Sequence, residues 1–334
     1  MRMRPILTVA AVGTAATAVG SALAVRAVGR RIDQRVDPGV DAILTPPADT
    51  THHRMATFDG GSLHVAEWGE GTPVVLLHGV TLQWWVWAPL FHLLGADHRV
   101  IAWDMRGHGE SRAGDEGVSL SAVATDLVTV LSDLQLENAV VVGHSMGGMG
   151  LGRFCIDHPI TRDRRVGHAV YLATSAAPLH PVLPSSDSRM HKGFARFATL
   201  GMESPVRYEW GDNALSRVLL RRTFGTNCSG AAVEELRKMV AEMSPESLAE
   251  AGQSIANHDI RDELLEVELP ATVITGTADI LTPPRHARIL AGSLPDSELH
   301  LLDGVGHQVM QEVPHELAQL LRTVAAHTGR DSAV

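Results

Sequence analysis

Short apolar runs alternate with helical stretches along most of the chain, and no other feature constrains the fold as strongly. The six runs span residues 73–79, 99–107, 139–145, 168–175, 271–279 and 298–304. Each run is apolar at most positions and bounded by Gly or Asp, as expected for a strand buried on both faces. Helical connections of this length join parallel strands by right-handed crossovers. The pattern predicts an α/β protein with a mostly parallel sheet and helices on both faces.

Two more strands precede these runs. Residues 53–58 and 62–68 are short alternating segments on either side of Asp59-Gly60-Gly61, which is typical of a β-hairpin turn. Together with the six runs they predict an eight-stranded sheet with an N-terminal hairpin. The hydrophobic content of 45% is sufficient for one large core and excludes a disordered chain.

The regular spacing is interrupted once. About ninety residues separate the run at 168–175 from the run at 271–279, far more than one crossover needs. The intervening residues 179–257 are mainly helical in pattern and predict a cap inserted into a core of residues 52–178 and 258–328. The Met and aromatic residues of this insertion, Trp210 among them, fit either a substrate pocket or the cap's own core.

The N-terminal segment differs from the rest of the chain. Residues 6–25 contain no charge and as a helix would be long enough to cross a bilayer. Arginines flank the stretch on both sides, so its orientation stays open, but they favour a membrane anchor over residues 1–36. A cleaved export signal is the alternative, because Ala22-Leu23-Ala24 has the form of a signal peptidase site. Residues 37–51, rich in Pro and Asp, predict a linker.

Charge and composition exclude several functions. The net charge of −10 argues against nucleic acid as a partner, because a phosphate backbone selects a basic surface. The two cysteines, Cys155 and Cys228, form no CxxC or zinc-like spacing, and no HExxH motif occurs, so no metal is predicted. No G-x-G-x-x-G follows the first parallel strand, and no cofactor is predicted.

The strongest chemical motif is Gly143-His144-Ser145-Met146-Gly147, a G-x-S-x-G sequence between a strand and a helix. A sharp turn at this place strains the backbone of Ser145 and exposes its hydroxyl, and small neighbours are needed because a Cβ would collide. The Met146 N–H then faces the reacting centre as an oxyanion donor. Val80 N–H, in the loop after the first parallel strand, is the predicted second donor.

With these motifs the chain resembles the α/β-hydrolase superfamily over residues 52–328. The matching motifs, in the family's order, are His78-Gly79-Val80, Asp104–Ser111 as the D-x-R-G-x-G-x-S turn, the serine motif, Gly276–Asp279 and Gly306-His307. The resemblance implies a Ser-Asp-His chain order for the catalytic residues. It also implies a structural Asp104–Arg106 pair, and packing or loop-fixing roles for His78, His108 and His144.

Each member of the expected triad has a chemical role. Ser145 needs a neutral imidazole to take its proton, and His307 lies in a Gly-rich loop after the last strand. Asp279 would accept a hydrogen bond from the other ring nitrogen of His307. As an alternative, Asp279 is a helix N-cap, a role that Thr282 could equally fill. Trp84, His144 and Trp210 are the candidate pocket residues, with a core role open for Trp84.

These features predict a serine hydrolase that cleaves a small apolar carboxylic ester through an acyl-serine. Cofactor-free perhydrolases (haloperoxidases) and carbon–carbon bond hydrolases share the motifs and remain alternatives, whereas the family's epoxide hydrolases and dehalogenases place aspartate where Ser145 stands. A non-catalytic binding protein on a hydrolase scaffold is a further alternative, and the presence of all three triad residues argues against it.

Overall fold

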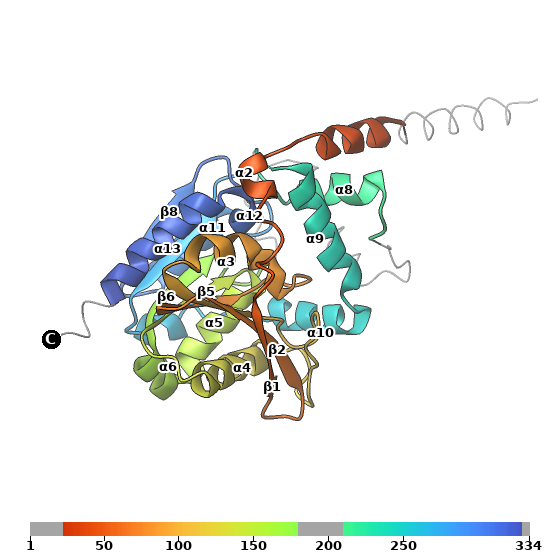
Figure 1. Cartoon of the computed structure of the whole chain (residues 1–334). Helices are drawn as coiled ribbons and strands as arrows, with labels where there is room; N and C mark the ends of the chain where they lie inside the picture. Colours follow the sequence, from red (N-terminus) through yellow and green to blue (C-terminus); the bar gives the residue numbers. More distant parts are fainter. Residues whose placement is uncertain (1–22, 180–209, 227, 329–334) are drawn as a thin grey trace, which may run out of the picture.

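A computed structural model of the chain describes residues 23–179, 210–226 and 228–328 (Figure 1). It contains one sheet of eight strands in the order β1-β2-β4-β3-β5-β6-β7-β8. The strands are β1 (Thr51–Ala56), β2 (Ser62–Trp68), β3 (Thr72–Leu77), β4 (His98–Trp103), β5 (Ala139–His144), β6 (Val166–Leu172), β7 (Ala271–Gly276) and β8 (Ser297–Leu302). The hairpin β1–β2 and the pair β2–β4 are antiparallel, and all other neighbours are parallel. The predicted mostly parallel sheet with an N-terminal hairpin is confirmed.

Helices cover both faces of this sheet, as the apolar runs predicted. Apart from the N-terminal helix over 23–33 and the predicted cap, the described helices are α2 (Pro38–Asp41), η1 (Trp84–Trp87), α3 (Ala88–Leu94), α4 (Leu120–Asp133), α5 (Met146–Asp157), α6 (Pro159–Arg165), η2 (Glu263–Glu266), α11 (Pro284–Gly292), α12 (Val309–Glu312) and α13 (Pro314–Thr328). Along β5, Val141 packs with α4, α5 and α11 in one core, and Val140 and Val142 pack with α3 and α13 in the other. Successive side chains of a strand point to opposite faces, so a strand buried on both faces must be apolar throughout.

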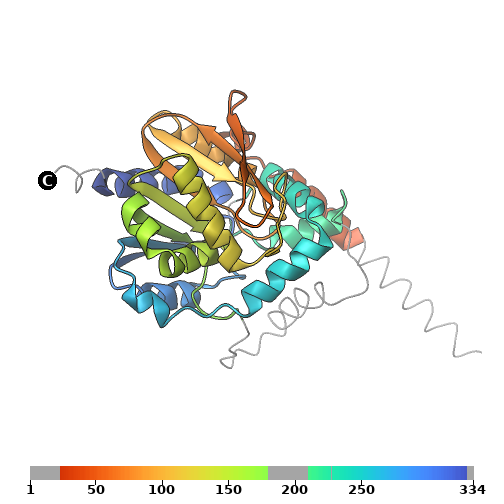
Figure 2. The same ribbon diagram turned by 90° about the horizontal axis from the view of Figure 1, so that it is seen from below.

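Of the predicted cap, the structure describes α8 (Ala214–Arg221), α9 (Gly230–Glu242) and α10 (Pro245–Ala256), which lie between β6 and β7 in the chain. Both views place these helices together on one side of the sheet, beside the N-terminal helix (Figures 1 and 2). The Glu250 carboxylate accepts the Val118 N–H over 2.9 Å, and the Ser254 hydroxyl accepts the Leu120 N–H over 2.9 Å, so α10 is tied to the start of α4. Residues 180–209 and 227 of the predicted cap lie outside the described residues.

The stem, residues 23–36, begins with a helix over 23–33 that docks on the cap. A Cβ on Gly29 would lie 2.8 Å from the Cβ of Ala214, so the stem and α8 approach closely. Asp33 pairs with Arg217 at 3.0 Å, and the Gly230 N–H donates to the Arg35 carbonyl oxygen over 2.8 Å. These contacts make the stem part of the folded body.

Residues 37–51 are more ordered than the linker prediction implies. Asp37 caps α2 through its side chain, and Val40 and Leu44 are buried in the same core as α3 and α13. No helix in the described ranges is both long and apolar enough to span a bilayer. Most of the predicted anchor, residues 6–25, lies outside those ranges.

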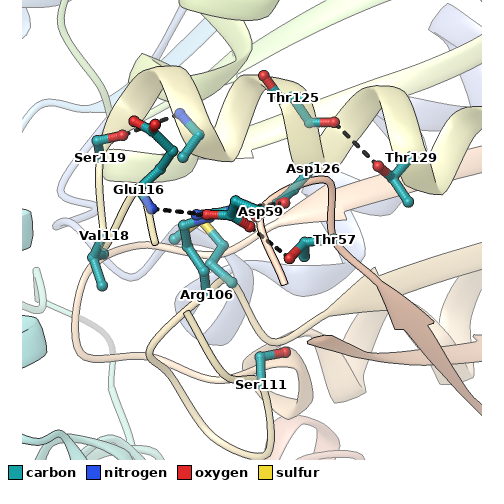
Figure 3. Close-up of polar contacts among 12 residues, drawn as sticks. Thr57, Asp59, Arg106, Ser111, Glu116, Val118, Ser119, Thr125, Asp126 and Thr129 are labelled. Atoms are coloured by element: carbon teal, nitrogen blue, oxygen red, sulfur yellow. Dashed lines mark hydrogen bonds and ion pairs between the residues drawn. The ribbon is translucent and has the colours of Figure 1, made fainter. Parts of the chain in front are cut away.

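Arg106 corrects one expectation from the sequence. Instead of pairing with Asp104, its buried guanidinium lies between Asp59, at 2.8 Å, and Asp126, at 2.7 Å (Figure 3). Its Nη1 also donates to the Gly117 carbonyl oxygen over 3.0 Å. The ion pairs hold the hairpin turn and α4 to the loop between β4 and α4, because a buried guanidinium needs partners for all its donors.

Candidate active site

Ser145 occupies a strained turn between β5 and α5. Its backbone angles, φ of 50° and ψ of −116°, lie outside the regions that residues other than glycine ordinarily adopt. A Cβ on Gly143 would lie 2.6 Å from the Gly147 carbonyl oxygen, and one on Gly147 would lie 2.5 Å from the His78 carbonyl oxygen. The Thr174 hydroxyl donates to the Ser145 carbonyl oxygen over 2.6 Å. The surrounding chain therefore holds the turn that the G-x-S-x-G motif predicted.

Asp279 and His307 form a buried hydrogen-bonded pair. His307 Nδ1 lies 2.8 Å from Asp279 Oδ2, which also accepts the Thr282 hydroxyl over 2.8 Å. Asp279 Oδ1 accepts the Leu281 N–H over 2.8 Å and the Thr282 N–H over 3.0 Å. Four donors around two oxygens suit a carboxylate, which only accepts hydrogen bonds. Asp279 thus closes the turn before α11 and orients the imidazole at once.

Asp279 is not the N-cap of α11. That position belongs to Pro283, which makes no side-chain cap. Thr282, the other capping candidate, donates its hydroxyl to Asp279 instead. Both residues therefore contribute to the hydrogen bonds around the imidazole. The sequence did not predict that Thr282 fixes the carboxylate, because the local pattern suggested only helix capping for its hydroxyl.

His144 links the serine turn to the histidine loop. Its Nε2 lies 2.9 Å from the His307 carbonyl oxygen, so Nε2 carries the proton and donates. The two rings lie 4.7 Å apart. Burial and the neighbouring His307 hold the pKa of His144 well below its usual range, so the ring stays neutral. Within the described part of the chain no hydrogen bond joins the Ser145 hydroxyl to the His307 ring. In ligand-free enzymes the hydrogen bonds between catalytic groups are often long or poorly aligned, and they shorten when substrate binds.

The predicted oxyanion loop lies against the serine turn. A Cβ on Gly79 would be 3.1 Å from the Ser145 Cβ, so the two segments almost touch. The loop makes a tight turn. The Leu82 N–H donates to the Gly79 carbonyl oxygen over 3.2 Å, and Thr81 has a φ of 66°. Val80 lies at the second position of this turn, and Met146 begins α5 directly after Ser145.

The His78 ring holds the predicted oxyanion loop in place through two hydrogen bonds. Its Nε2 accepts the Met105 N–H over 2.9 Å, so Nδ1 carries the proton and donates to the Gly79 carbonyl oxygen over 2.7 Å. Burial, with a smaller effect of His108, lowers the pKa of His78 to about 3. The ring is neutral, and both its nitrogens are engaged, which fits the loop-fixing role that the family resemblance implied.

The remaining pocket candidates have mainly packing contacts. Trp84 is 9% exposed and packs against His52, His64 and Phe91. Its backbone N–H donates to Asp104 Oδ1 over 2.9 Å, a contact that ties η1 to the turn after β4. Trp210 is partly buried against the core that contains α9, and its carbonyl oxygen accepts from Arg237 over 2.9 Å. Of the three, His144 contacts a triad candidate, through its hydrogen bond to the His307 carbonyl oxygen.

Similarity to known proteins identifies the family of this chain. The model of the alpha/beta hydrolase family matches residues 74–320, which include the serine turn, the acid turn and the histidine loop. The chain belongs to the alpha/beta hydrolase family. It is 30% identical over 264 residues to the non-heme chloroperoxidase CPO-A1 of Kitasatospora aureofaciens, a match that covers 76% of this chain and 91% of that protein.

Two further relatives of this alpha/beta hydrolase are named as esterases. The pimeloyl-[acyl-carrier protein] methyl ester esterase of Aeromonas hydrophila is 26% identical over 264 residues, covering 78% of this chain and 98% of the relative. The solved structure of a thermophilic esterase from Thermogutta terrifontis is 25% identical with a TM-score of 0.66, covering 83% and 99% of the two chains. The family thus includes both esterases and haloperoxidases among the neighbours of this protein.

Proposed function

We propose that this alpha/beta hydrolase cleaves a carboxylic ester through an acyl-serine intermediate, with Ser145 as nucleophile, His307 as base and Asp279 as the residue that orients the base. The single observation that carries the proposal is the buried Asp279–His307 hydrogen bond of 2.8 Å, beside a serine held in a strained turn. The esterases among the relatives support the ester as the substrate class.

The mechanism follows from the properties of each group. Because Asp279 accepts from Nδ1, the neutral His307 ring presents an unprotonated Nε2 as base. As the Ser145 oxygen bonds to the ester carbonyl carbon, Nε2 takes the hydroxyl proton, and the Val80 and Met146 amides donate to the oxyanion. His307 then gives that proton to the leaving alkoxide. The same ring then takes a proton from water, whose oxygen attacks the acyl carbon. The bond between that carbon and the Ser145 oxygen breaks, the ring returns its proton to the serine oxygen, and the acid leaves.

A small apolar ester is the proposed substrate. The apolar character of the buried side chains near the serine turn supports an apolar acyl group: Met146 and Trp87 are fully buried, and Trp210 packs onto the core that contains α9. Among the described residues, no group of three or more His, Cys, Asp or Glu side chains is placed to hold a metal ion. The proposed chemistry uses only side chains and backbone amides of this chain.

A perhydrolase is the second candidate, and the 30% identity to a chloroperoxidase favours it. In that reaction hydrogen peroxide replaces water and attacks the acyl-serine carbonyl carbon, so that a peracid leaves and Ser145 regains its proton. Both activities pass through the same acyl-serine. They differ only in the acyl acceptor, so the ratio of hydrolysis to peracid formation at fixed peroxide separates them.

The decisive test is labelling with a fluorophosphonate probe, which reacts only with an activated serine. We expect the wild type to be labelled, and Ser145→Ala and His307→Ala to stay unlabelled. A folded wild-type protein that is not labelled, or equal labelling of Ser145→Ala, contradicts the serine hydrolase. A series of p-nitrophenyl esters of increasing chain length then measures the size of the acyl group.

We also propose that residues 6–25 anchor the protein in a membrane. The charge-free sequence supports this proposal, as do Arg26, Arg30 and Arg31, whose side chains are exposed on the helix that follows. We expect the full chain to sediment with membranes and a chain that begins at Leu23, which keeps the stem, to be soluble. Equal solubility of the two contradicts the anchor. If the mass of the purified protein shows that its chain begins near residue 25, the segment is a cleaved signal instead.

A further inference from the structure

Glu312, at the end of α12, has a buried carboxylate that binds backbone rather than a cation. The residue is 6% exposed. Its Oε2 accepts the Gly225 N–H over 2.7 Å, and the Gly306 N–H lies 3.0 Å from Oε1 and 3.1 Å from Oε2. Gly306 precedes the proposed base in the chain, whereas Gly225 follows the cap helix α8. One side chain therefore joins two segments that are distant in sequence.

The two segments also bind each other directly. The His307 N–H donates to the Thr223 carbonyl oxygen over 2.7 Å, and the Thr226 N–H donates to the Gly304 carbonyl oxygen over 2.8 Å. A Cβ on Gly225 would lie 2.0 Å from the Gly304 carbonyl oxygen. Because the backbones are in contact, residues 223–226 form a support on which the histidine loop lies.

We propose that Glu312 is a positioning residue for His307, which it aligns by holding the histidine loop against the support formed by residues 223–226. This inference rests on the proposed function, because it assigns His307 the role of base. It goes beyond that function by connecting the base to the cap: α8 ends directly before the support. A displacement of α8 would move the loop that carries the imidazole.

A carboxylate suits this place because its partners only donate. The amides of Gly225, Gly306 and Gln308 all point to it, and Gln308 lies in the histidine loop as well. Burial raises the pKa of Glu312 to about 7, although these amides lower it. The charged or titratable neighbours are Arg221 on α8, which favours the anion, and the Cys228 thiol. Protonation replaces an acceptor by an O–H donor and weakens the link as pH falls through neutrality.

The test compares Glu312→Gln with the wild type. Glutamine has the same shape, but its NH2 group would face an amide N–H and lose one of the two links. We expect kcat to fall by about 10- to 100-fold, because a catalytic group displaced by about 1 Å costs this much, while KM changes less than about threefold. The rate of fluorophosphonate labelling should fall in parallel. Glu316→Gln, an exposed neighbour on α13, is the matched control and should behave as the wild type.

The pH profile distinguishes positioning from a structural role. In the wild type, log(kcat/KM) should fall below neutrality with a slope greater than one, because protonation of either His307 or Glu312 lowers activity. In Glu312→Gln the slope should be one. Glu312→Asp keeps the charge on a shorter side chain, and we expect it to retain the steep limb with a lower kcat; it serves if the glutamine variant folds poorly.

Two results would overturn the proposal. One is a folded Glu312→Gln with wild-type kcat, labelling rate and pH slope. The other is a loss of thermal stability in Glu312→Gln without any change in kcat or slope, which would make Glu312 structural only. Failure of the proposed function is distinguishable from both, because the wild type itself would then remain unlabelled.

Discussion

Replacing Asp279 by asparagine should abolish most catalysis without unfolding the protein. In the wild type, Asp279 Oδ1 accepts two backbone N–H groups, from Leu281 and Thr282, and Oδ2 accepts from His307 Nδ1. An asparagine oxygen must keep the Oδ1 position, because an NH2 group there would face two donors. The NH2 therefore takes the Oδ2 position and donates to His307 Nδ1. This moves the ring proton to Nε2, the nitrogen that acts as base in the proposed mechanism.

A ring protonated at Nε2 cannot take the serine proton. When the geometry is kept and only the tautomer is wrong, kcat falls on the order of 10⁴-fold in triads of this kind. That loss corresponds to about 5 kcal/mol of transition-state stabilisation at about 1.4 kcal/mol for each factor of ten. We expect the melting temperature of Asp279→Asn to change by only about 4 °C or less. Shape and both amide bonds at Oδ1 are retained, and the Thr282 hydroxyl, which donates to Oδ2 in the wild type, can rotate to accept from the second N–H of the new NH2 group.

The assay is the initial rate with a p-nitrophenyl ester, together with the rate of fluorophosphonate labelling. Asp303→Asn is the matched control: this aspartate accepts a hydrogen bond from the Thr277 hydroxyl on the same edge of the sheet, at an exposed position. Its activity should stay within about twofold of the wild type. If folded Asp279→Asn retains more than about a tenth of the wild-type rate, the argument from tautomer and hydrogen-bond direction is wrong.

Three more perturbations test the site and its supports. In Gly79→Ala the new Cβ would lie 2.9 Å from His144 Nδ1, so we expect kcat to fall at least about tenfold. The control Gly292→Ala, whose Cβ meets nothing within 4 Å, should be fully active. Equal activities of the two variants would contradict the close approach at Gly79. Arg106→Met leaves two buried carboxylates without their cation and should cost about 3–5 kcal/mol in urea unfolding; a loss under about 1 kcal/mol would show that the ion pairs contribute little to stability. A chain that begins at Asp37 lacks the stem and should show faster hydrogen exchange in α8 and α9 than one that begins at Leu23, whereas identical exchange would mean that the stem does not support the cap.

Residues whose role depends on neighbours in the chain could be predicted from the sequence, and residues whose partners are distant in the chain could not. Ser145 could be predicted because its turn depends on neighbours in sequence, above all Gly143 and Gly147. Glu312 could not, because a single glutamate in an apolar helix has no local pattern, and its partner Gly225 lies 87 residues away in the chain. Arg106 was assigned the wrong partner for the same reason: the nearest acid in the motif was Asp104, but the fold brings Asp59 and Asp126 to it.

Local features of the amino-acid sequence were enough to predict the succession of strands and helices, the strained serine turn and the candidates for base and acid, because periodicity, glycine spacing and turn chemistry act between residues close in the chain. The tertiary structure was needed to identify the carboxylates that pair with Arg106, the packing of residues 23–36 on α8, and the contact of the histidine loop with residues 223–226. These contacts depend on distances between segments that the chain connects only through the folded core, and no local pattern encodes those distances.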